Sequence, residues 1–264
     1  MTTPPETVDR EATLRLTLRT LRLPAFQDHW QEVAHQAEQG GWTYGTFLDH
    51  HARMEVEERR RRRIGRQLKA SKLPSTKTLG DLDLSKLSPK VRRRRPRLCQ
   101  GDFVERGDNL LIFGLPGRGK THVAAAIGHE LIQRGHRVLF RSTNLLVQGL
   151  LAAKRDLALE RALKALDRFD ALILDDLGYV QQDRAEMEVL FTLLAERYER
   201  RSVIITSNLV FSQWDQIFKD PMTTAAAIDR VVHHSVILEM TGPSIRTAEA
   251  LAQSKADEPG ASTP

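Results

Sequence analysis

The sequence predicts an α/β fold in which a parallel five-stranded sheet follows a small, all-helical N-terminal domain. Residues 1–70 carry helical periodicity alone, whereas short apolar runs alternate with helical stretches from residue 101 onward. Such alternation requires crossover connections between strands, which produce a parallel sheet. We expect four parts: a helical domain at 1–70, a linker at 71–100, an α/β domain at 101–250 and a disordered tail at 251–264.

Three helices are expected in the N-terminal domain. The first lies within the first 23 residues and places Leu14, Leu18 and Leu21 at helical spacing. A second opens at Pro24 and stops at the pair of glycines 40–41, because glycine is common just past a helix end. A third runs from about residue 43 to about residue 68. The side chains expected to face inward from the last two helices are Phe26, Trp30, Val33, Ala34, Ala37, Phe47, Leu48 and His51.

The linker and the strands are predicted from local composition. Residues 71–100 hold three prolines and the basic run Arg92–Arg95, so we expect weak turns there rather than a regular element. Beyond them, apolar runs predict five strands, at Asn109–Phe113, Arg137–Arg141, Ala171–Asp175, Val203–Thr206 and Val236–Glu239.

Composition excludes several classes of protein. Of the 264 residues, 41% are hydrophobic and 28% are charged, which is the balance of a globular chain with a core. No apolar stretch approaches the ~20 residues of a membrane span, and acidic residues precede any apolar run, unlike in a secretory signal. Cys99 is the only cysteine, which excludes an internal disulfide and a cysteine zinc cluster. We therefore expect a cytoplasmic protein without membrane contact.

Charge is divided unevenly along the chain. Residues 1–100 carry 21 Lys and Arg against 12 Asp and Glu, whereas residues 101–264 carry 19 against 22. A basic first part indicates contact with a polyanion, and the alternative is a solvated basic surface without a partner.

Residues 114–121, GLPGRGKT, match the phosphate-binding pattern G-x-x-x-x-G-K-[ST] between a buried strand and a helix. Glycines let the backbone amides turn toward the phosphates, and the start of the helix adds positive potential. In such a loop Lys120 contacts the β- and γ-phosphates of ATP and the Thr121 hydroxyl ligates Mg²⁺. The nucleotide-binding residues we expect are Gly114, Leu115, Pro116, Gly117, Arg118, Gly119, Lys120, Thr121 and His122.

Polar side chains also end two other predicted strands. Asp175 and Asp176 follow the run ALIL, and phosphoryl transfer needs one carboxylate for the Mg²⁺ shell and another to orient the attacking water. Asn208 follows the run SVIITS and would contact that water or the γ-phosphate. The alternative for each is a strand that simply runs into a turn.

Seven segments in this order, among them GLPGRGKT, LILDDLGY, ITSN, IDRVVHH and GPSIR, make the chain resemble the IstB family of insertion-sequence helper ATPases. That family is similar to the helicase loader DnaC and belongs to the AAA+ ATPases. The resemblance covers residues 10–250 and implies an AAA+ P-loop core at 101–250. It also implies ATP-dependent oligomerisation on DNA, followed by recruitment and stimulation of a transposase.

The same resemblance implies roles for single residues. Asp175 matches the magnesium-associated acid and Asn208 the polar sensor. Asp176 matches the residue that activates water, where most AAA+ proteins have a glutamate that is one methylene longer. Arg230 matches the arginine finger that completes a neighbouring subunit's site, and Arg246 matches the second sensor. Without these roles Arg230 is a surface helix residue and Arg246 a salt-bridge partner.

The densest positive charge of the chain lies in the predicted third helix. Consecutive arginines project all around a helix, so they suit sequence-independent phosphate contact rather than the reading of one groove. The DNA-binding residues we expect are Arg59, Arg60, Arg61, Arg62, Arg63 and Arg66. The alternative is a solvated face in which Glu55, Glu57 and Glu58 pair with Arg59, Arg61 and Arg62 at i, i+4.

Two other functions use the same phosphate loop. A DnaC-like helicase loader shares the ATPase domain but serves a replicative helicase, and a small-molecule kinase would need a second-substrate motif that we do not find. The pair His233-His234 has no partner at metal-ligand spacing in the sequence, so no ligand role is assigned to it.

Overall fold

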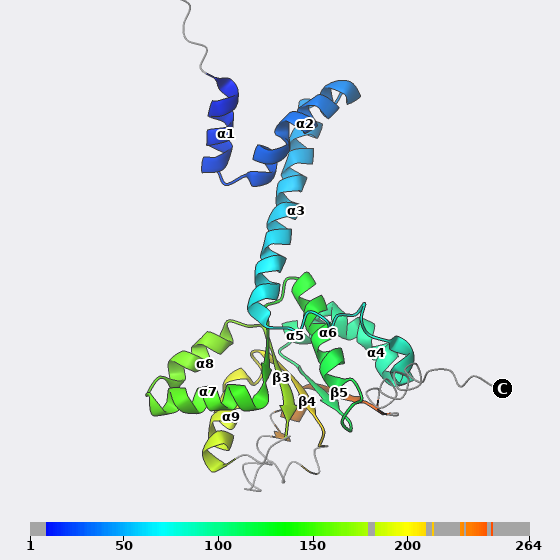
Figure 1. Cartoon of the computed structure of the whole chain (residues 1–264), viewed down its shortest axis with the longest axis vertical. Helices are drawn as coiled ribbons and strands as arrows, with labels where there is room; N and C mark the ends of the chain where they lie inside the picture. The colour runs from blue at the N-terminus through cyan, green and yellow to red at the C-terminus, as the bar shows by residue number, and fades with distance from the viewer. Residues whose placement is uncertain are drawn as a thin grey trace, which may run out of the picture. The chain divides into compact units, whose positions relative to one another are not determined.

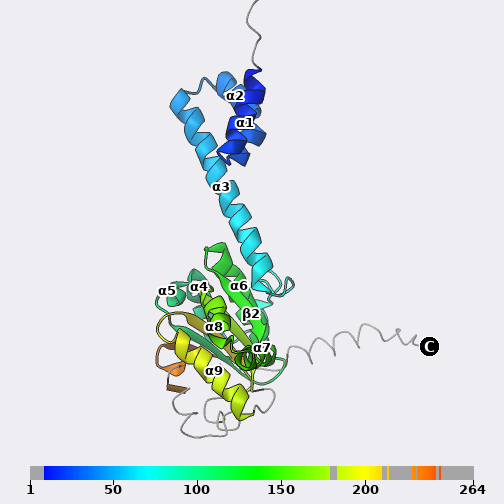
Figure 2. The same cartoon turned by 90° about the vertical axis from the view of Figure 1, so that its left-hand side faces the viewer.

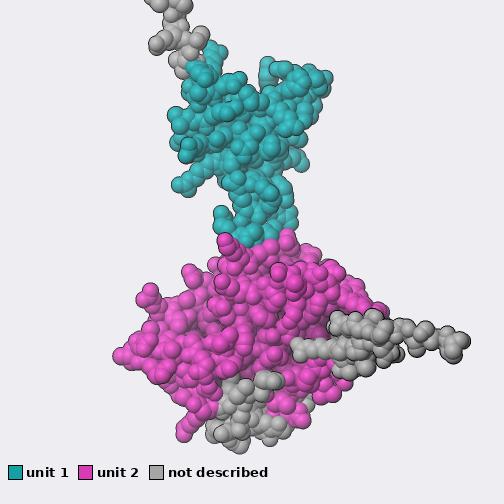
Figure 3. All heavy atoms as spheres, in the orientation of Figure 1, with its two compact units in different colours: residues 1–66 teal, residues 67–264 magenta. Residues whose placement is uncertain are grey.

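The computed structural model describes residues 9–178, 183–209, 213, 228–229, 231–241 and 244. The chain divides into two compact units, residues 1–66 and residues 67–264 (Figure 3). The predicted residues Arg230 and Arg246 and the predicted tail at 251–264 lie outside the described residues. No helix in the described part is both long and apolar enough to cross a membrane.

The first unit is helical. It contains α1 (Arg10–Thr20), α2 (Pro24–Gly40) and the part of α3 (Tyr44–Ser71) that reaches residue 66. Helices α1 and α2 lie side by side (Figure 2). Pro24 occupies the first turn of α2, and Gly41 ends that helix in the left-handed conformation, as the sequence predicts.

An aromatic cluster joins α2 to α3. The His51 ring is fully buried, stacks on Phe26 with 4.6 Å between centroids and meets Phe47 edge-on at 4.8 Å. Burial lowers the pKa of His51, with help from His50 and His29, so this histidine is a neutral part of the core.

One of the side chains predicted to face inward in the first unit is wrong, and the leucines of the first helix are mostly exposed. Leu48 is 61% exposed, because Phe47 and His51 already fill the face toward α2 and the next residue turns ~100° away from Phe47. In α1 only Leu18 is buried, while Leu14 and Leu21 are exposed.

The second unit is built on a sheet of five parallel strands, as predicted, in the order β2-β3-β4-β1-β5. Figure 1 labels three of these strands, β3, β4 and β5. The strands are β1 (Asn109–Phe113), β2 (Val138–Ser142), β3 (Ala171–Leu177), β4 (Ser202–Ser207) and β5 (Ser235–Glu239). All residues of β1 and β4 are buried, as expected for central strands of a parallel sheet covered on both faces.

Helices cover the two faces of the sheet. Helix α6 (Lys120–Gln133) packs on one face, where Gly128 lets the side chain of Ile173 in β3 approach closely. The other face carries α7 (Thr143–Arg155) and α9 (Arg184–Arg197), with α8 (Leu159–Asp167) packed against both. The carboxyl ends of β1, β3 and β4 therefore meet at one edge of the sheet, where the predicted site residues lie.

Residues 71–100 differ from the predicted linker. They include a 3-10 turn at Leu84–Lys86 and helix α4 (Pro89–Gln100), which packs against α6 and precedes the short α5 (Asp102–Glu105). Ser88 caps α4, and its buried side chains are Val91, Leu98 and Cys99. Burial raises the pKa of the Cys99 thiol to about 11. The arginine run and Pro96 obscure this apolar stripe in the sequence; Arg92–Arg94 and Pro96 are exposed, whereas Arg95 is half-buried on the same face as the stripe.

Candidate nucleotide site

The phosphate loop follows β1 and opens α6, as predicted. Gly114, at φ 150°, passes so close to β5 that a Cβ there would lie 2.5 Å from the carbonyl oxygen of Met240. Gly119, at φ 81°, is the N-cap of α6. The loop therefore needs glycine both for its contact with Met240 and for the left-handed turn that aims amide groups at a ligand.

Lys120 joins the loop to the end of β4. Its side chain is only 5% exposed, and Nζ donates hydrogen bonds to the carbonyl oxygen of Leu115 at 3.0 Å and to Oδ1 of Asn208 at 2.5 Å. The structure thus brings together two residues that lie 88 positions apart and that the sequence predicts for one site.

A β-bulge formed by the two aspartates interrupts the pairing of β3 with β4. The pairing of β3 with β4 moves from Leu174–Ile205 to Leu177–Ser207, so Asp175 and Asp176 together face Thr206. Asp176 takes a left-handed φ of 59° and is exposed, whereas Asp175 is 8% exposed. Two adjacent carboxylates consequently have different surroundings.

Thr206 is a site residue that the sequence analysis missed. Its buried hydroxyl donates to Oδ1 of Asp175 at 2.6 Å and accepts from the backbone amide of Asp176 at 2.9 Å, so it holds both aspartates in place. The sequence signal for this role was a hydroxyl side chain within an apolar strand that ends directly before the predicted Asn208.

The surroundings of Asp175 disfavour the charged form of its carboxyl group. Burial raises its pKa, and the neighbouring Asp176 adds to the rise, while hydrogen bonds from Thr206 and Thr121 and the charge of Lys77 act in the opposite direction. A divalent cation beside Asp175 and Thr121 would compensate the buried charge, so this pair of oxygen donors fits Mg²⁺.

A cavity of about 310 Å³ lies beside the phosphate loop. Its walls include the phosphate loop from Pro116 to His122, together with Asp176 and Asn208. They also include residues that the sequence analysis assigned to the linker and did not predict for the site: Lys77, Asp81, Leu82, Asp83 and Lys86. Of the predicted loop residues, Leu115 is 59% exposed and Arg118 donates to the carbonyl of Met240 at 3.2 Å.

Two histidines of α6 contact the stretch of chain before α4 that contributes the unpredicted cavity residues. The Nε2 atom of His122 lies 3.0 Å from the carbonyl oxygen of Thr78, and that of His129 lies 3.0 Å from the carbonyl oxygen of Pro74. The Thr78 side chain in turn donates to Asp81, which lowers the pKa of that carboxyl. Histidines spaced i, i+7 on α6 were a weak signal for this packing.

The arginine run of the first unit lies on a basic groove. Seven arginines, Arg19, Arg22, Arg59, Arg60, Arg62, Arg63 and Arg66, line a hollow of about 860 Å³ within this unit. Arg19 and Arg22 were not predicted for this surface.

Ion pairs occupy part of the run. Glu55 pairs with Arg59 at 2.9 Å and Glu58 with Arg62 at 2.5 Å, as the i, i+4 alternative predicts. Glu58 also pairs with Arg61, and Glu57 lies 3.9 Å from Arg60 rather than near Arg61. Within the described residues, neither Arg63 nor Arg66 forms an ion pair.

The parallel sheet, the phosphate loop after β1 and the polar ends of β3 and β4 define a P-loop nucleotide-binding protein of the AAA+ class. Solved structures with the same fold include DnaA from Aquifex aeolicus bound to AMPPCP, with a TM-score of 0.53 and 20% identity over 70% of this chain and 56% of that chain. DnaI is similar with a TM-score of 0.52 and 25% identity over 62% of this chain and 90% of that chain.

The chain belongs to the family of IstB-like ATP binding proteins, whose sequence model matches residues 16–253. A relative in Sinorhizobium fredii, named as an insertion sequence ATP-binding protein, is 46% identical over 246 residues, 93% of this chain and 82% of the relative. The ATP-binding protein of insertion sequence IS21 from Pseudomonas aeruginosa is 37% identical over 237 residues, 89% of each chain.

Proposed function

We propose that this chain hydrolyses ATP and that nucleotide-dependent assembly on DNA lets it recruit a partner transposase. The observation that supports hydrolysis best is one cavity lined by the phosphate loop, Asp176 and Asn208. Binding alone would need the loop but no second carboxylate or amide at its rim. The names of its relatives, which belong to insertion sequences, favour transposition as the process served.

Mg²⁺ would be held by Thr121 and Asp175. When bound beside the nucleotide, it neutralises charge that develops on the phosphate oxygens. The buried carboxylate of Asp175 is fixed by Thr206 and so keeps its position before the ion arrives.

Asp176 and Asn208 act on the attacking water in this proposal. Asp176 is exposed toward the cavity, and its carboxylate accepts a proton from the water or orients it. Asn208 accepts a hydrogen bond from Lys120, whose ammonium group also donates to the carbonyl oxygen of Leu115 in the phosphate loop. Thr206 sets the backbone of Asp176 and acts as a positioning residue.

DNA contact belongs to the basic groove of the first unit. Its arginines would bind phosphates with little sequence preference, because guanidinium groups on a helix surface contact the backbone rather than base edges. Arg63 and Arg66 are the best placed for it, because in the described part of the chain neither of them forms an ion pair, unlike Arg59, Arg61 and Arg62.

Assembly and its sensors rest on the family resemblance. Arg230 would reach the γ-phosphate in a neighbouring subunit, and Arg246 would report the nucleotide state from within its own subunit. A site completed in trans makes the active unit a homo-oligomer, so ATP and DNA would each favour the assembled state.

A mixing experiment tests hydrolysis and assembly together. Arg230→Ala subunits keep an intact pocket, and Asp176→Asn subunits keep an intact finger, so each alone should hydrolyse ATP poorly. Mixed oligomers should recover turnover at sites that pair the two. If mixed assembly is verified and no mixture recovers activity, Arg230 does not act in trans.

A helicase loader is the second candidate, because a solved structure named as the DnaC helicase loader shares this fold. The two candidates differ in partner and not in the ATPase. Stimulation of DNA strand transfer by an insertion-sequence transposase would support transposition. Delivery of a replicative helicase onto single-stranded DNA would support loading instead.

A further inference from the structure

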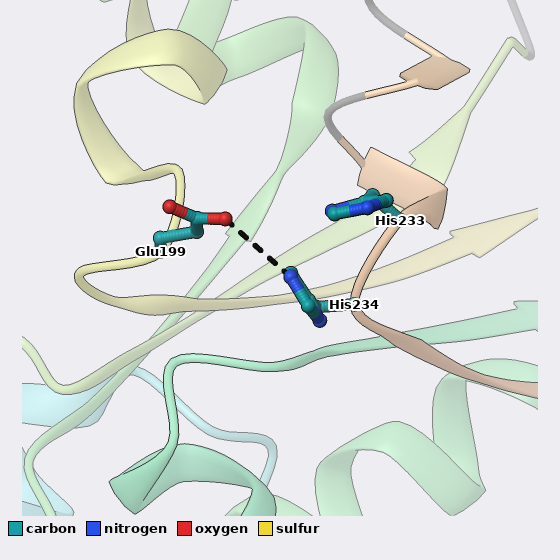
Figure 4. A group of neighbouring side chains, drawn as sticks. All are labelled: Glu199, His233 and His234. Atoms are coloured by element: carbon teal, nitrogen blue, oxygen red, sulfur yellow. Dashed lines mark ion pairs between the residues drawn. The ribbon is translucent and has the colours of Figure 1, made fainter.

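Glu199, His233 and His234 come together at the amino ends of the strands. Glu199 lies just before β4, and the two histidines lie just before β5. Because both strands run parallel to β1, this cluster is at the opposite edge of the sheet from the phosphate loop. Figure 4 shows the carboxylate and the two rings turned toward one another.

The three side chains have the spacing of a metal site. One ligand atom from each lies within 4.8 Å of the other two. His234 Nε2 is 3.4 Å from Glu199 Oε1, and the two imidazole rings are 4.2 Å apart between centroids. An ion with ligands at ~2.1 Å in tetrahedral geometry separates them by ~3.4 Å, so small side-chain rotations complete the arrangement. All three residues are exposed and can make those rotations.

The backbone that carries the two histidines is fixed by Asn109. Its amide donates to the carbonyl of His234 at 2.7 Å, and its buried side chain donates to the carbonyl of Val231 at 3.1 Å. The same side chain accepts from the amide of Val203 in β4 at 2.9 Å. One buried asparagine therefore ties the histidine turn to the starts of β1 and β4.

Glu199 is held in an unusual conformation. Its φ of 54° is left-handed, which costs a non-glycine residue energy, and Gly107 packs so tightly that a Cβ there would lie 3.2 Å from the Glu199 carbonyl carbon. The neighbouring Tyr198 hydroxyl lies 3.1 Å from Nδ1 of His233 and orients that ring, the type of outer contact that metal-binding histidines have.

We propose that Glu199, His233 and His234 bind a divalent transition-metal ion such as Zn²⁺. Two imidazoles and one carboxylate are a donor set for zinc, nickel or copper, whereas Mg²⁺ prefers oxygen ligands alone. The ion would cross-link the turn before β4 to the turn before β5. The sequence prediction that the histidine pair has no ligand role is thereby revised, because the third ligand lies 34 residues away from His233.

Zinc competition on the full-length protein tests this proposal. Wild-type protein without nucleotide or Mg²⁺ should withdraw about one equivalent of Zn²⁺ per chain from a chromophoric chelator. His233→Ala, His234→Ala and Glu199→Gln should each weaken that binding at least tenfold. His35→Ala removes an exposed histidine outside the cluster and should bind zinc as the wild type does.

Thermal unfolding provides a second measurement. Zinc should raise the Tm of the wild type, because a ligand that binds only the folded chain stabilises it, and should not raise that of His234→Ala. In EDTA both proteins should melt alike, which shows that the variant folds. Equal zinc binding by wild type and the cluster variants, or no stoichiometric binding at all, would leave the cluster as an ion pair only. Neither readout depends on ATP turnover.

Discussion

Two regions of the chain present positive charge to phosphate, and they do so in different ways. In the second unit, Lys120 is nearly buried, and two hydrogen bonds fix its ammonium group beside a loop shaped by glycines. In the first unit, the arginines of α3 are exposed on a helix surface around a broad groove. A fixed, enclosed cation selects one ligand geometry, whereas exposed guanidinium groups bind any polyanion and lose affinity as salt rises.

The number of arginines overstates the positive charge that the first unit can offer to DNA. Arg59, Arg61 and Arg62 already face glutamates at 2.5–2.9 Å. Exposed pairs of this kind contribute little to stability, but they reduce the charge available to DNA. Lys120, by contrast, donates these hydrogen bonds to a backbone carbonyl oxygen and to an amide oxygen, which are both uncharged groups.

The largest effect should come from Lys120→Ala. The change removes the fixed cation and leaves Asn208 without its hydrogen-bond donor, so ATP turnover should fall by about 10²-fold or more. Steady-state phosphate release measures it. Lys164→Ala, which removes an exposed lysine paired with Glu160, serves as the control and should retain wild-type turnover.

Substitutions in the arginine groove should change the salt dependence of DNA binding rather than the affinity for nucleotide. Replacing Arg63 and Arg66 with glutamine removes up to two phosphate contacts, so the slope of log affinity against log salt should flatten by up to ~1.8 on duplex DNA. Fluorescence anisotropy with labelled DNA at several salt concentrations measures it.

A matched pair in the same helix sharpens that test. Arg61→Gln and Arg62→Gln remove guanidinium groups that Glu58 already engages, so they should change the slope less than the first pair. Equal slopes in all the variants would show that the ion pairs do not govern DNA contact. Nucleotide affinity should stay unchanged throughout.

The segment at 77–86 should contribute a smaller part of the nucleotide affinity. Lys77 lines the cavity and its charge reaches Asp175, so Lys77→Ala should weaken binding of a fluorescent ATP analogue by roughly three- to tenfold. Lys72→Ala changes an exposed lysine that is not a cavity residue and should have no effect.

Asp175→Asn should raise stability without ligand. Because burial raises the folded-state pKa of Asp175, this carboxyl favours the folded chain at low pH and disfavours it as pH rises through that pKa. Asparagine keeps the hydrogen bond from Thr206 but carries no charge. In EDTA at pH 8 the Tm should rise by about 2–4 °C for each kcal/mol gained.

The pH dependence separates this cause from better packing. The gain should shrink as pH falls through the folded-state pKa and should vanish below the usual carboxyl pKa of ~4, where the wild-type Asp175 is protonated in both states. A gain that is constant with pH would mean that the buried charge is not its origin.

The sequence correctly predicted the structural features that depend on a few adjacent residues. The strand at Asn109–Phe113 has the predicted bounds, and the phosphate loop begins α6 at the predicted place. Such features depend on short apolar runs and on glycines, which are visible in a few adjacent residues. The end of β3 was predicted two residues short, because the bulge at Asp175 and Asp176 depends on Thr206 in another strand.

Features that depend on distant residues were missed for the same reason. Helix α4 was read as a linker because its buried stripe is small beside its arginines, and its packing against α6 is not visible in the local sequence. Lys77 and Lys86 belong to the cavity through contacts of His122 and His129 with residues some 44–55 positions away. Glu199 likewise meets His234 only because β4 and β5 both flank β1.

The most direct test of the account is the ATPase activity of Asp176→Asn, measured together with its nucleotide affinity. If the exposed carboxylate acts on the attacking water while Lys120 and the loop hold the phosphates, affinity should match the wild type. Turnover should then fall by about 10²-fold or more. Wild-type turnover in this variant, or loss of nucleotide binding without loss of folding, would contradict the division of roles between the two aspartates.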